Sequence, residues 1–321
     1  MTTNASLKPG RYAVVDIGTV TARLLIADVC DDGHIEDVRR ETTICNLGVG
    51  VDKTGLLAPE SIERVGNVVE EYLAIMREEQ VGDSPIPVMA VATSASRDAD
   101  NSDEFIERLD RAGLKLDVIP GDREAVLSFA GASSAFPGER VVVTDSGGGS
   151  TEIIAGMAGG EPERAHSCDV GCRRVTERFL QSDPPSTAEL ANASVWVAEE
   201  FSEYFDAMRE DGQLDGRIVA VAGTATSIVS MREEMAVYDS SRVHKAVVTR
   251  GDVDALLKKL SGMTVEQRKQ VVGLNPDRAP VIVAGVLIMQ QIMELAQADE
   301  FTVSECDILH GIVMALASQQ R

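Results

Sequence analysis

Two spacings of apolar residues alternate along the chain and predict an alternation of strands and helices. Short apolar runs rich in β-branched residues predict strands in the first part of the chain, over residues 12–16, 22–29, 34–45, 86–92 and 116–119. Apolar residues that recur every three or four positions predict helices packed by one face, from Pro59 onward and over residues 102–112 and 122–134. A glycine-rich loop is expected over residues 46–57.

The same order of elements starts again near residue 140. Strands are predicted over residues 140–145, 152–157, 163–168 and 217–221, and helices over residues 171–182 and 186–211. The tail is predicted to be helical throughout, over residues 250–261, 264–272, 277–298 and 304–319. A strand ending in Asp, a glycine turn, two more strands and a helix therefore occur twice. This repeat predicts two similar α/β halves with a ligand cleft between them.

Glycine turns follow predicted strands at three places and carry the candidate chemistry. They are DIGTVT (16–21), DSGGGSTE (145–152) and AGTATS (222–227). Glycine lets the backbone turn sharply and present its N–H groups, and a row of N–H groups beside hydroxyls binds an anion. The Asp before each of the first two turns suits a hard cation such as Mg²⁺. The third turn precedes a predicted helix, whose dipole also favours an anion.

A plain hairpin is the alternative interpretation of each turn taken alone, and for Gly18 it is the simpler one. Three consecutive glycines between Asp145 and Ser150 are poor strand residues, so the second turn needs another explanation. The matching positions of these turns in the two halves favour phosphate binding. None of them has the sequence of a P-loop or of a Rossmann dinucleotide fingerprint.

The charge of the chain excludes two classes of partner. Its 321 residues include 30 Lys and Arg against 52 Asp and Glu, a formal net charge of −22. This excess repels nucleic acid and anionic membrane surfaces, so we expect neither as a partner. A phosphorylated substrate is compatible with the charge, because a local pocket can oppose the overall field.

The cysteines and the N-terminal segment predict a cytoplasmic protein. Five scattered cysteines predict reduced thiols, mostly buried, and not a disulfide framework. Cys168 and Cys172 have no second Cys/His pair nearby to complete a zinc site. The N-terminal segment lacks the apolar region of a signal peptide. The longest apolar run, residues 280–289, is shorter than the roughly 20 residues that span a bilayer.

Several longer segments are distinctive when taken together. The strongest are DIGTVTARLLI (16–26), ATSASRDADN (92–101), GDREAVLSFAGA (121–132), TDSGGGSTEI (144–153) and AVAGTATSI (220–228). Weaker ones are VGCRRVTERFL (170–180), NPDRAPVIVAGVLIM (275–289) and SECDILHGIVMAL (304–316). This set resembles the exopolyphosphatase / guanosine pentaphosphate phosphohydrolase (Ppx/GppA) family of the actin, hexokinase and Hsp70-like superfamily, over nearly the whole chain.

The resemblance implies an α/β fold of two similar actin-like (ribonuclease H-like) domains. Each domain is expected to be a mixed sheet with helices, with the active-site cleft between the two. We expect the N-terminal domain over residues 1–133 and the C-terminal domain over residues 134–303. A C-terminal helix over residues 304–321 can pack back on the first domain. The resemblance also implies a homodimer.

The activity that the resemblance implies is hydrolysis of phosphoanhydrides. Terminal phosphate would be removed from inorganic polyphosphate or from the 5′ end of guanosine pentaphosphate. The family's general base maps to Glu124, and a carboxylate can align a water and accept its proton. Mg²⁺ or Mn²⁺ is expected on Asp16, Asp145 and Glu152. The expected phosphate-binding residues are Gly18, Thr19, Thr21, Arg97, Gly147, Gly148, Gly149, Ser150, Thr151, Gly223 and Thr224.

Structural roles are the alternatives for the charged residues of this set. Glu124 would then be a solvated residue in the first turn of a helix, where the dipole favours it. Arg97, whose planar guanidinium suits phosphate oxygens, would pair with Asp98 or another carboxylate. Arg173 and Arg174 resemble a polar strip beside the cleft, and a solvated helix face is the alternative for them.

The chain departs from the family pattern in ways that affect the expected substrate. Val20 stands where the first loop usually has Asn, which removes an amide that would face phosphate or water. Many relatives carry a further helical domain, so we expect short polyphosphate chains to be preferred here. Guanosine pentaphosphate hydrolysis and a non-catalytic phosphate or nucleotide sensor are the alternatives, and Val20 is the feature that favours the sensor. A sugar or acetate kinase has less support, because no adenosine pocket is identified.

Overall fold

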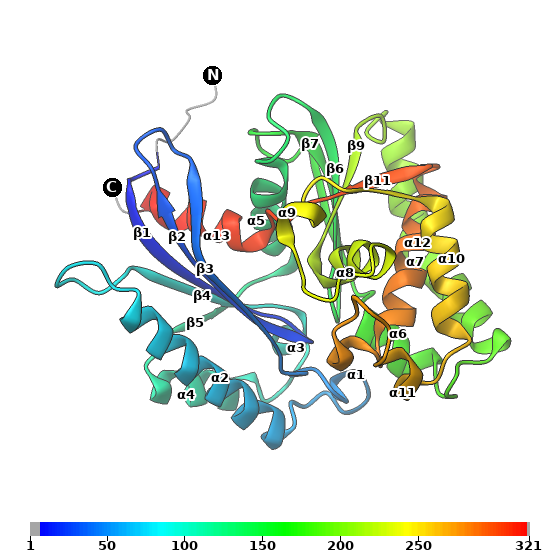
Figure 1. The fold of residues 1–321 in the computed structure, drawn as a ribbon, viewed down its shortest axis with the longest axis horizontal. Helices are drawn as coiled ribbons and strands as arrows, with labels where there is room; N and C mark the ends of the chain where they lie inside the picture. Colours follow the sequence, from blue (N-terminus) through cyan, green and yellow to red (C-terminus); the bar gives the residue numbers. More distant parts are fainter. Residues whose placement is uncertain (1–6, 320–321) are drawn as a thin grey trace. The chain divides into compact units, whose positions relative to one another are not determined.

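The chain divides into two compact units in the computed structural model, which describes residues 7–319 (Figure 1). Unit 1 comprises the described residues up to Gly131 together with those from Ile308 onward, and unit 2 comprises Ala132–Asp307. The boundary between them falls within helix α5 (Gly121–Ser133).

A five-stranded mixed sheet forms the centre of unit 1, with the strand order β3-β2-β1-β4-β5. Its strands are β1 (Gly10–Ile17), β2 (Thr21–Val29), β3 (Ile35–Ile44), β4 (Val88–Ala92) and β5 (Leu116–Val118). β1, β2 and β3 are antiparallel neighbours, whereas β4 runs parallel to β1 and β5 parallel to β4. The carboxyl ends of β1, β4 and β5 therefore lie at the same edge of the sheet.

Helices cover both faces of this sheet (Figure 1). They are α1 (Val51–Thr54), α2 (Pro59–Glu78), α3 (Ser94–Arg97), α4 (Ser102–Ala112), α5 and α13 (Ile308–Gln319). Successive residues of β1 point to opposite faces. Ala13 and Val15 join the apolar cluster under α2 and α4, whereas Tyr12 and Val14 join the cluster under α13. The C-terminal helix thus completes the core of unit 1.

Unit 2 has a six-stranded mixed sheet with the order β10-β11-β9-β6-β7-β8. Its strands are β6 (Arg140–Ser146), β7 (Thr151–Met157), β8 (Arg164–Cys168), β9 (Arg217–Val221), β10 (Val247–Thr249) and β11 (Glu300–Val303). β9 is parallel to both β6 and β11, and the other pairs are antiparallel. Read from β8, this order repeats that of unit 1, since β8-β7-β6-β9-β11 corresponds to β3-β2-β1-β4-β5.

Helix α12 (Ile282–Leu295) of unit 2 is buried along most of its length. Four of the helices in unit 2 pack on it, namely α6 (Cys172–Phe179), α7 (Thr187–Glu210), α8 (Ala222–Arg232) and α10 (Arg250–Ser261). The others are α9 (Ser240–Val243), α11 (Val265–Arg268) and the 3₁₀ helix η1 (Pro276–Arg278). Capping boxes start α7, α10 and α11 and satisfy backbone donors at their N-termini. The apolar sequence of α12 thus reflects a central position in the core.

The structure confirms the two similar α/β units and corrects several element assignments. The tail from residue 250 onward was predicted to be helical throughout, but β11 lies within it and β10 lies just before it, and both strands extend the second sheet. These strands have three and four residues, too few for periodicity to distinguish them from helix ends. The third glycine turn was predicted to precede a helix, but helix α8 already begins at Ala222.

Among residues 7–319, no helix is both long enough and apolar enough to cross a lipid bilayer.

Candidate active-site residues

The first two glycine turns are equivalent hairpins, one in each unit. The Gly18 N–H donates to the Thr21 carbonyl at 2.8 Å, and the Gly147 N–H donates to the Ser150 carbonyl at 2.9 Å. Each hairpin joins the first and second strands of its sheet. The repeat seen in the sequence is therefore a repeat of the same turn geometry, at the edge where the parallel strands end.

A neighbouring segment clamps the turn in unit 1. The Val20 carbonyl accepts hydrogen bonds from the N–H groups of Cys45 and Asn46, and the Thr19 carbonyl accepts one from Gly48. The contact at Gly48 is so close that a Cβ there would lie 2.3 Å from Thr19 Cγ2. The backbone of the turn is thereby held in one conformation.

The two side chains between the end of β1 and the start of β2, Thr19 and Val20, are buried. The Thr19 hydroxyl has no hydrogen-bond partner among the residues that the structure describes, although it is shielded from solvent. A buried hydroxyl of this kind is costly unless a ligand satisfies it, and the role of Thr19 in phosphate binding stays a prediction. The Val20 side chain is 5% exposed. Val20 therefore fills space inside unit 1.

The two hairpins differ in the charge that faces their Asp across the strands. Asp16 pairs with Arg23 on β2, and Arg23 Nη2 lies 2.6 Å from Asp16 Oδ2. At the equivalent place in unit 2, Asp145 faces Glu152 on β7. The Asp of the unit 1 hairpin thus faces an arginine, whereas the Asp of the unit 2 hairpin faces a second acidic side chain.

The acidic pair of unit 2 is the arrangement that suits a divalent cation. Asp145 and Glu152 are both buried, and the Ser167 hydroxyl donates to Glu152 Oε1 at 2.7 Å. Carboxylate oxygens are the protein ligands that Mg²⁺ prefers, and it commonly takes only one or two of them. Within residues 7–319, no group of three or more His, Cys, Asp or Glu side chains is arranged to hold a metal ion.

Glu124 and Arg97 meet although 27 positions separate them. α3 follows β4 and α5 follows β5, and these two strands are parallel neighbours, so both helices begin at one edge of the sheet. Arg97 Nη1 donates to Glu124 Oε2 at 2.6 Å and to the Ile119 carbonyl at 3.1 Å. The Glu124 side chain is only 10% exposed. Glu124 is therefore a buried, paired carboxylate and not a solvated residue of a helix N-terminus.

The start of α3 also lies beside the first hairpin. The Thr93 N–H donates to the Ile17 carbonyl, and a Cβ on Gly18 would lie 3.9 Å from Thr93 Oγ1. The Gly18 turn, Arg97 and Glu124 accordingly belong to one region of unit 1.

The triglycine turn of unit 2 packs directly against the start of α6. A Cβ on Gly171 would lie 2.4 Å from backbone atoms of Gly148 and Gly149. The N–H groups of Cys172 and Arg173 donate to the carbonyls of Gly147 and Gly148, at 3.0 and 2.8 Å. With its carbonyls held by α6, the turn has a fixed backbone.

Arg173 and Arg174 follow Gly171 and are only 12% and 11% exposed at their side chains. Arg174 Nε donates to the Gly149 carbonyl at 2.9 Å. The alternative of a solvated helix face is therefore wrong for these two arginines. Their positive charge lies beside the triglycine turn.

Two hydroxyl residues close the second hairpin. Ser150 is buried, and the Thr151 hydroxyl donates to the Val170 carbonyl at 2.6 Å. Thr151 therefore connects the hairpin to the chain before α6. The sequence predicted Thr151 as a phosphate-binding residue and did not indicate this supporting contact.

The third predicted turn is the first turn of α8, and an arginine from another segment covers it. A Cβ on Gly223 would lie 2.0 Å from Arg278 Nη1, so the guanidinium rests against the glycine. The next residue, Thr224, is buried against Gly285 of α12. Sequence reasoning missed Arg278, although it stands in the NPDRAP segment that contributed to the resemblance.

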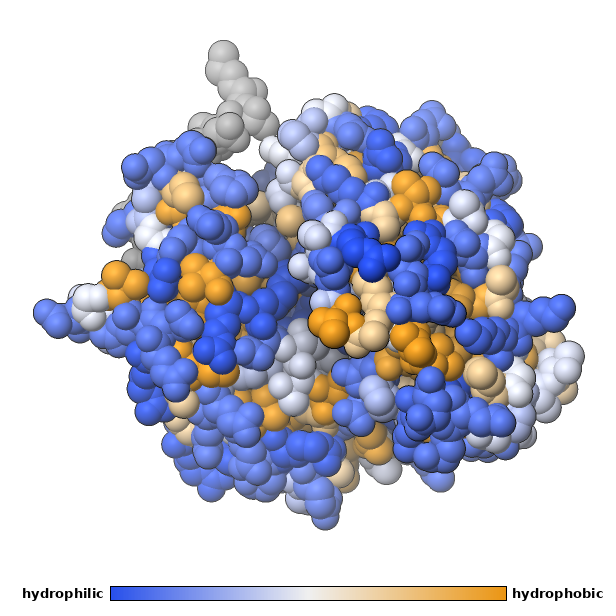
Figure 2. Space-filling view, in the orientation of Figure 1, coloured by the Kyte–Doolittle hydropathy of each residue, from blue (hydrophilic) through white to orange (hydrophobic). Residues whose placement is uncertain are grey.

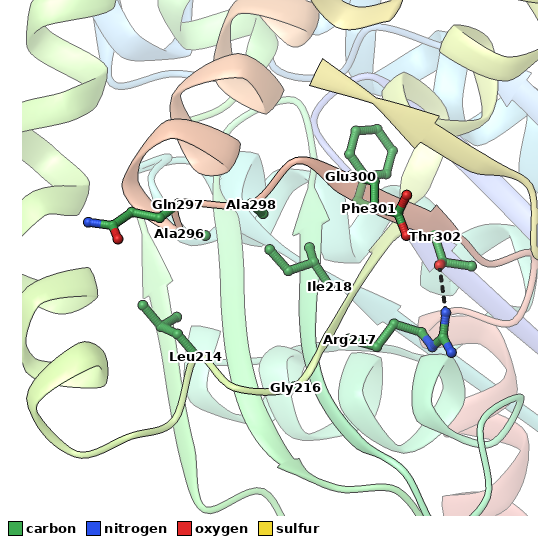
Figure 3. A pocket seen from close by; sticks show the side chains of 10 residues that line it. All are labelled: Leu214, Gly216, Arg217, Ile218, Ala296, Gln297, Ala298, Glu300, Phe301 and Thr302. Carbon is green, nitrogen blue, oxygen red and sulfur yellow. Dashed lines mark hydrogen bonds between the residues drawn. The ribbon is translucent and has the colours of Figure 1, made fainter. Parts of the chain in front are cut away.

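A pocket in unit 2 lies at the opposite edge of the sheet from these turns (Figure 3). It has a volume of about 400 Å³ and is lined mainly by residues at the amino ends of β9 and β11 and by the chain just before each of them. Ligands of open α/β sheets bind at the carboxyl ends of the parallel strands, which is where the glycine turns lie. The pocket therefore does not belong to the predicted site.

Burial keeps the thiols next to the second turn protonated. It raises the pKa of Cys168 to about 12 and also raises the pKa of Cys172. All five cysteines are free, as expected for reduced thiols. Neither Cys168 nor Cys172 therefore has the lowered pKa that is typical of a nucleophilic thiol.

Comparison with known proteins identifies the family to which this fold belongs. The chain matches the Ppx/GppA phosphatase family over residues 25–320. It is 38% identical to exopolyphosphatase 2 of Mycobacterium tuberculosis over 96% of this chain and 98% of the relative. The solved structure of an exopolyphosphatase-like protein is 32% identical, with a TM-score of 0.87, over 96% of this chain and 98% of that one. The Ppx/GppA family member of Aquifex aeolicus is 30% identical, with a TM-score of 0.78, over 97% and 99%.

The chain belongs to the Ppx/GppA phosphatase family. It is a hydrolase with the two-domain, actin-like fold of that family, so the fold and the enzyme class inferred from the resemblance are confirmed.

The contact at Gly171 gives a test of how the second turn is held. Gly171→Ala is expected to lower the free energy of unfolding by about 1–3 kcal/mol, because the added methyl group overlaps backbone atoms that cannot rotate away. Urea unfolding measures the change. Gly251→Ala is the matched control, since a Cβ there would meet its nearest atom at 3.8 Å. Equal stability of the Gly171 variant and the unchanged protein would contradict the described contact.

Proposed function

We propose that this phosphatase releases the terminal phosphate of linear inorganic polyphosphate by attack of a water that Glu124 activates. The observation that carries the proposal is the buried Glu124 carboxylate, held by Arg97 beside the Gly18 hairpin. The similarity to exopolyphosphatase 2 over nearly its whole length supports the choice of substrate.

In the proposed reaction the two glycine turns bind phosphate oxygens through backbone N–H groups. Thr19 adds its buried hydroxyl in unit 1, and Arg173, Arg174 and Arg278 lie beside the turns of unit 2. Fixed donors of this kind stabilise the charge that spreads over the phosphoryl oxygens during transfer. The turns need no reorganisation for this, because neighbouring segments already hold their backbones.

Glu124 aligns the attacking water and accepts its proton. The water oxygen forms the new bond to the terminal phosphorus, the bridging P–O bond breaks, and the shortened chain leaves with its electron pair. Arg97 can contact both the Glu124 carboxylate and a phosphate oxygen, because its guanidinium carries several donors in one plane. The ion pair keeps the base correctly placed before the substrate binds.

A divalent cation, Mg²⁺ or Mn²⁺, fits the acidic pair Asp145 and Glu152. When bound, such an ion neutralises charge on the phosphate oxygens. Asp16 was expected to share this role, but its carboxylate is engaged by Arg23. We assign Asp16 to holding that guanidinium and place the cation on the unit 2 hairpin.

The net charge of −22 favours short chains among the polyphosphates. Repulsion between the protein and a polyanion grows with the number of phosphates, and it acts at long range only when salt is low. A screen of phosphate release from polyphosphates of graded length, with guanosine pentaphosphate in parallel, tests the substrate. We expect the highest kcat/KM for short polyphosphate. Release from guanosine pentaphosphate alone would overturn the choice of polyphosphate.

The role of Glu124 predicts the effect of an isosteric change. Glu124→Gln is expected to lower kcat for phosphate release by at least about 100-fold with little change in KM, because the amide still accepts a bond from Arg97 but takes no proton. Glu104→Gln, an exposed acidic residue in the first turn of α4, is the control and should leave kcat unchanged. If Glu124→Gln kept the original kcat, the assignment of Glu124 as the general base would be wrong.

The proposed cation site predicts a difference between the two hairpins. Chelation of divalent cations is expected to stop phosphate release. Glu152→Gln should raise the Mg²⁺ concentration for half-maximal rate by at least about tenfold, since even outer partners of a ligand change metal affinity by about 10–100-fold. Asp16→Asn should leave that concentration near its original value. Titration calorimetry with Mg²⁺ checks, without turnover, that Glu152→Gln weakens Mg²⁺ binding more than Asp16→Asn does. Equal effects of both variants would contradict the assignment.

A further inference from the structure

The C-terminal helix α13 lies on the face of the unit 1 sheet that α2 and α4 do not cover (Figure 1). It packs by an apolar face that comprises Ile308, Leu309, Ile312, Val313, Leu316 and Ala317. Leu127 of α5 belongs to the same cluster. α13 therefore touches both the sheet and the helix that carries Glu124.

Gly311 of α13 makes the contact with α5 and has no side chain there. A Cβ on Gly311 would lie 1.9 Å from the Leu127 carbonyl oxygen, 2.7 Å from its carbonyl carbon and 3.1 Å from its Cα. All three are backbone atoms, so no change of rotamer can relieve the overlap. Any larger residue at this position would force the two helices apart by about 1 Å, since real Cβ atoms essentially never approach other atoms within 3.0 Å.

A second contact holds α13 against the sheet. His310, the neighbour of Gly311, lies with Nε2 3.1 Å from Asp37 Oδ1 on β3. The apolar cluster holds α13 against the sheet as well. We therefore expect a separation of the two helices to displace α5.

Displacement of α5 would reach Glu124 directly. Leu127 lies three residues, less than one turn, after Glu124 in the same helix. Arg97, the partner of Glu124, is also bound to the Ile119 carbonyl before α5, so it does not follow the helix freely. A shift of α5 thus changes where the carboxylate stands relative to Arg97 and the Gly18 turn.

We propose that Gly311 is a positioning residue for the reaction. Because Gly311 has no side chain, α13 can pack closely against α5, and this packing holds Glu124 where it can contact the attacking water. The proposal rests on the proposed role of Glu124 as the base. In this proposal the C-terminal helix α13 helps to position Glu124, although the two are far apart in the sequence.

Gly311→Ala tests the proposal. An alanine inside a helix would by itself favour the helix, so a defect reports the contact with Leu127 and not a loss of helix propensity. We expect kcat for phosphate release from polyphosphate to fall by about 100-fold, the effect that a misplacement of about 1 Å has on a reacting group. KM should stay within about twofold, because Gly311 lies outside the phosphate-binding turns. Amide hydrogen exchange should become faster in α5 and stay unchanged in β1.

Ala317→Val is the matched control. It also adds carbon atoms to a buried position of α13, but six residues farther along the helix than Gly311. We expect it to lower the Tm while kcat and the exchange of α5 stay close to their original values. An equal loss of kcat in both variants would overturn the proposal, because the defect would then follow general destabilisation.

The remaining outcomes separate the proposal from the function on which it rests. A folded Gly311→Ala protein with kcat within about threefold and unchanged exchange in α5 overturns the positioning role. Absence of phosphate release by the unchanged protein overturns the proposed function, while hydrogen exchange still decides whether Gly311 seats α5. Where Gly311→Ala does not fold, Leu127→Val loosens the apolar packing of α5 against α13 instead, because the Leu127 side chain belongs to the cluster that α13 joins. That variant should lower kcat at least fivefold with KM unchanged, and its full activity would count against the proposal.

Discussion

Parallel pairing of strands is the constraint on which the arrangement of the site depends. Because β4 and β5 run parallel to β1, the chain that leaves each of them starts from one edge of the sheet. Residues from three distant segments, around Gly18, Arg97 and Glu124, therefore become neighbours in unit 1. The same pairing of β6, β9 and β11 places the triglycine turn and the start of α8 at one edge in unit 2. If neighbouring strands among β1, β4 and β5 were antiparallel, the segments that follow them would begin at alternate edges of the sheet.

The two copies of the hairpin carry different charges at one pair of facing positions. With equal turn geometry, the unit 1 copy carries the Asp16–Arg23 pair, and the unit 2 copy carries Asp145 beside Glu152. A single exchange of charge at one cross-strand position separates a neutral pair from one that suits a cation. The two hairpins therefore share their backbone geometry but differ in the charged side chains that they carry.

The sequence was sufficient for the repeat, the strands flanking the glycine turns and the family, because each depends on local patterns several residues long. It was insufficient for features that arise between distant segments. Arg278 against Gly223 and the burial of Arg173 depend on packing that no spacing encodes. The strands β10 and β11 were missed because they consist of three and four residues. The predicted metal ligands, the phosphate-binding roles and the homodimer stay predictions.

The close contacts at Gly171 and Gly311 have a consequence for how this sequence can change. At both of them backbone atoms of the neighbouring segment occupy the place of a Cβ, so every substitution is resisted whatever its polarity. A charged group at the site can be exchanged for another at a local cost, whereas these two glycines have no substitute that leaves the backbone in place. We therefore expect divergence within such a fold to alter the chemistry of the site sooner than these two positions.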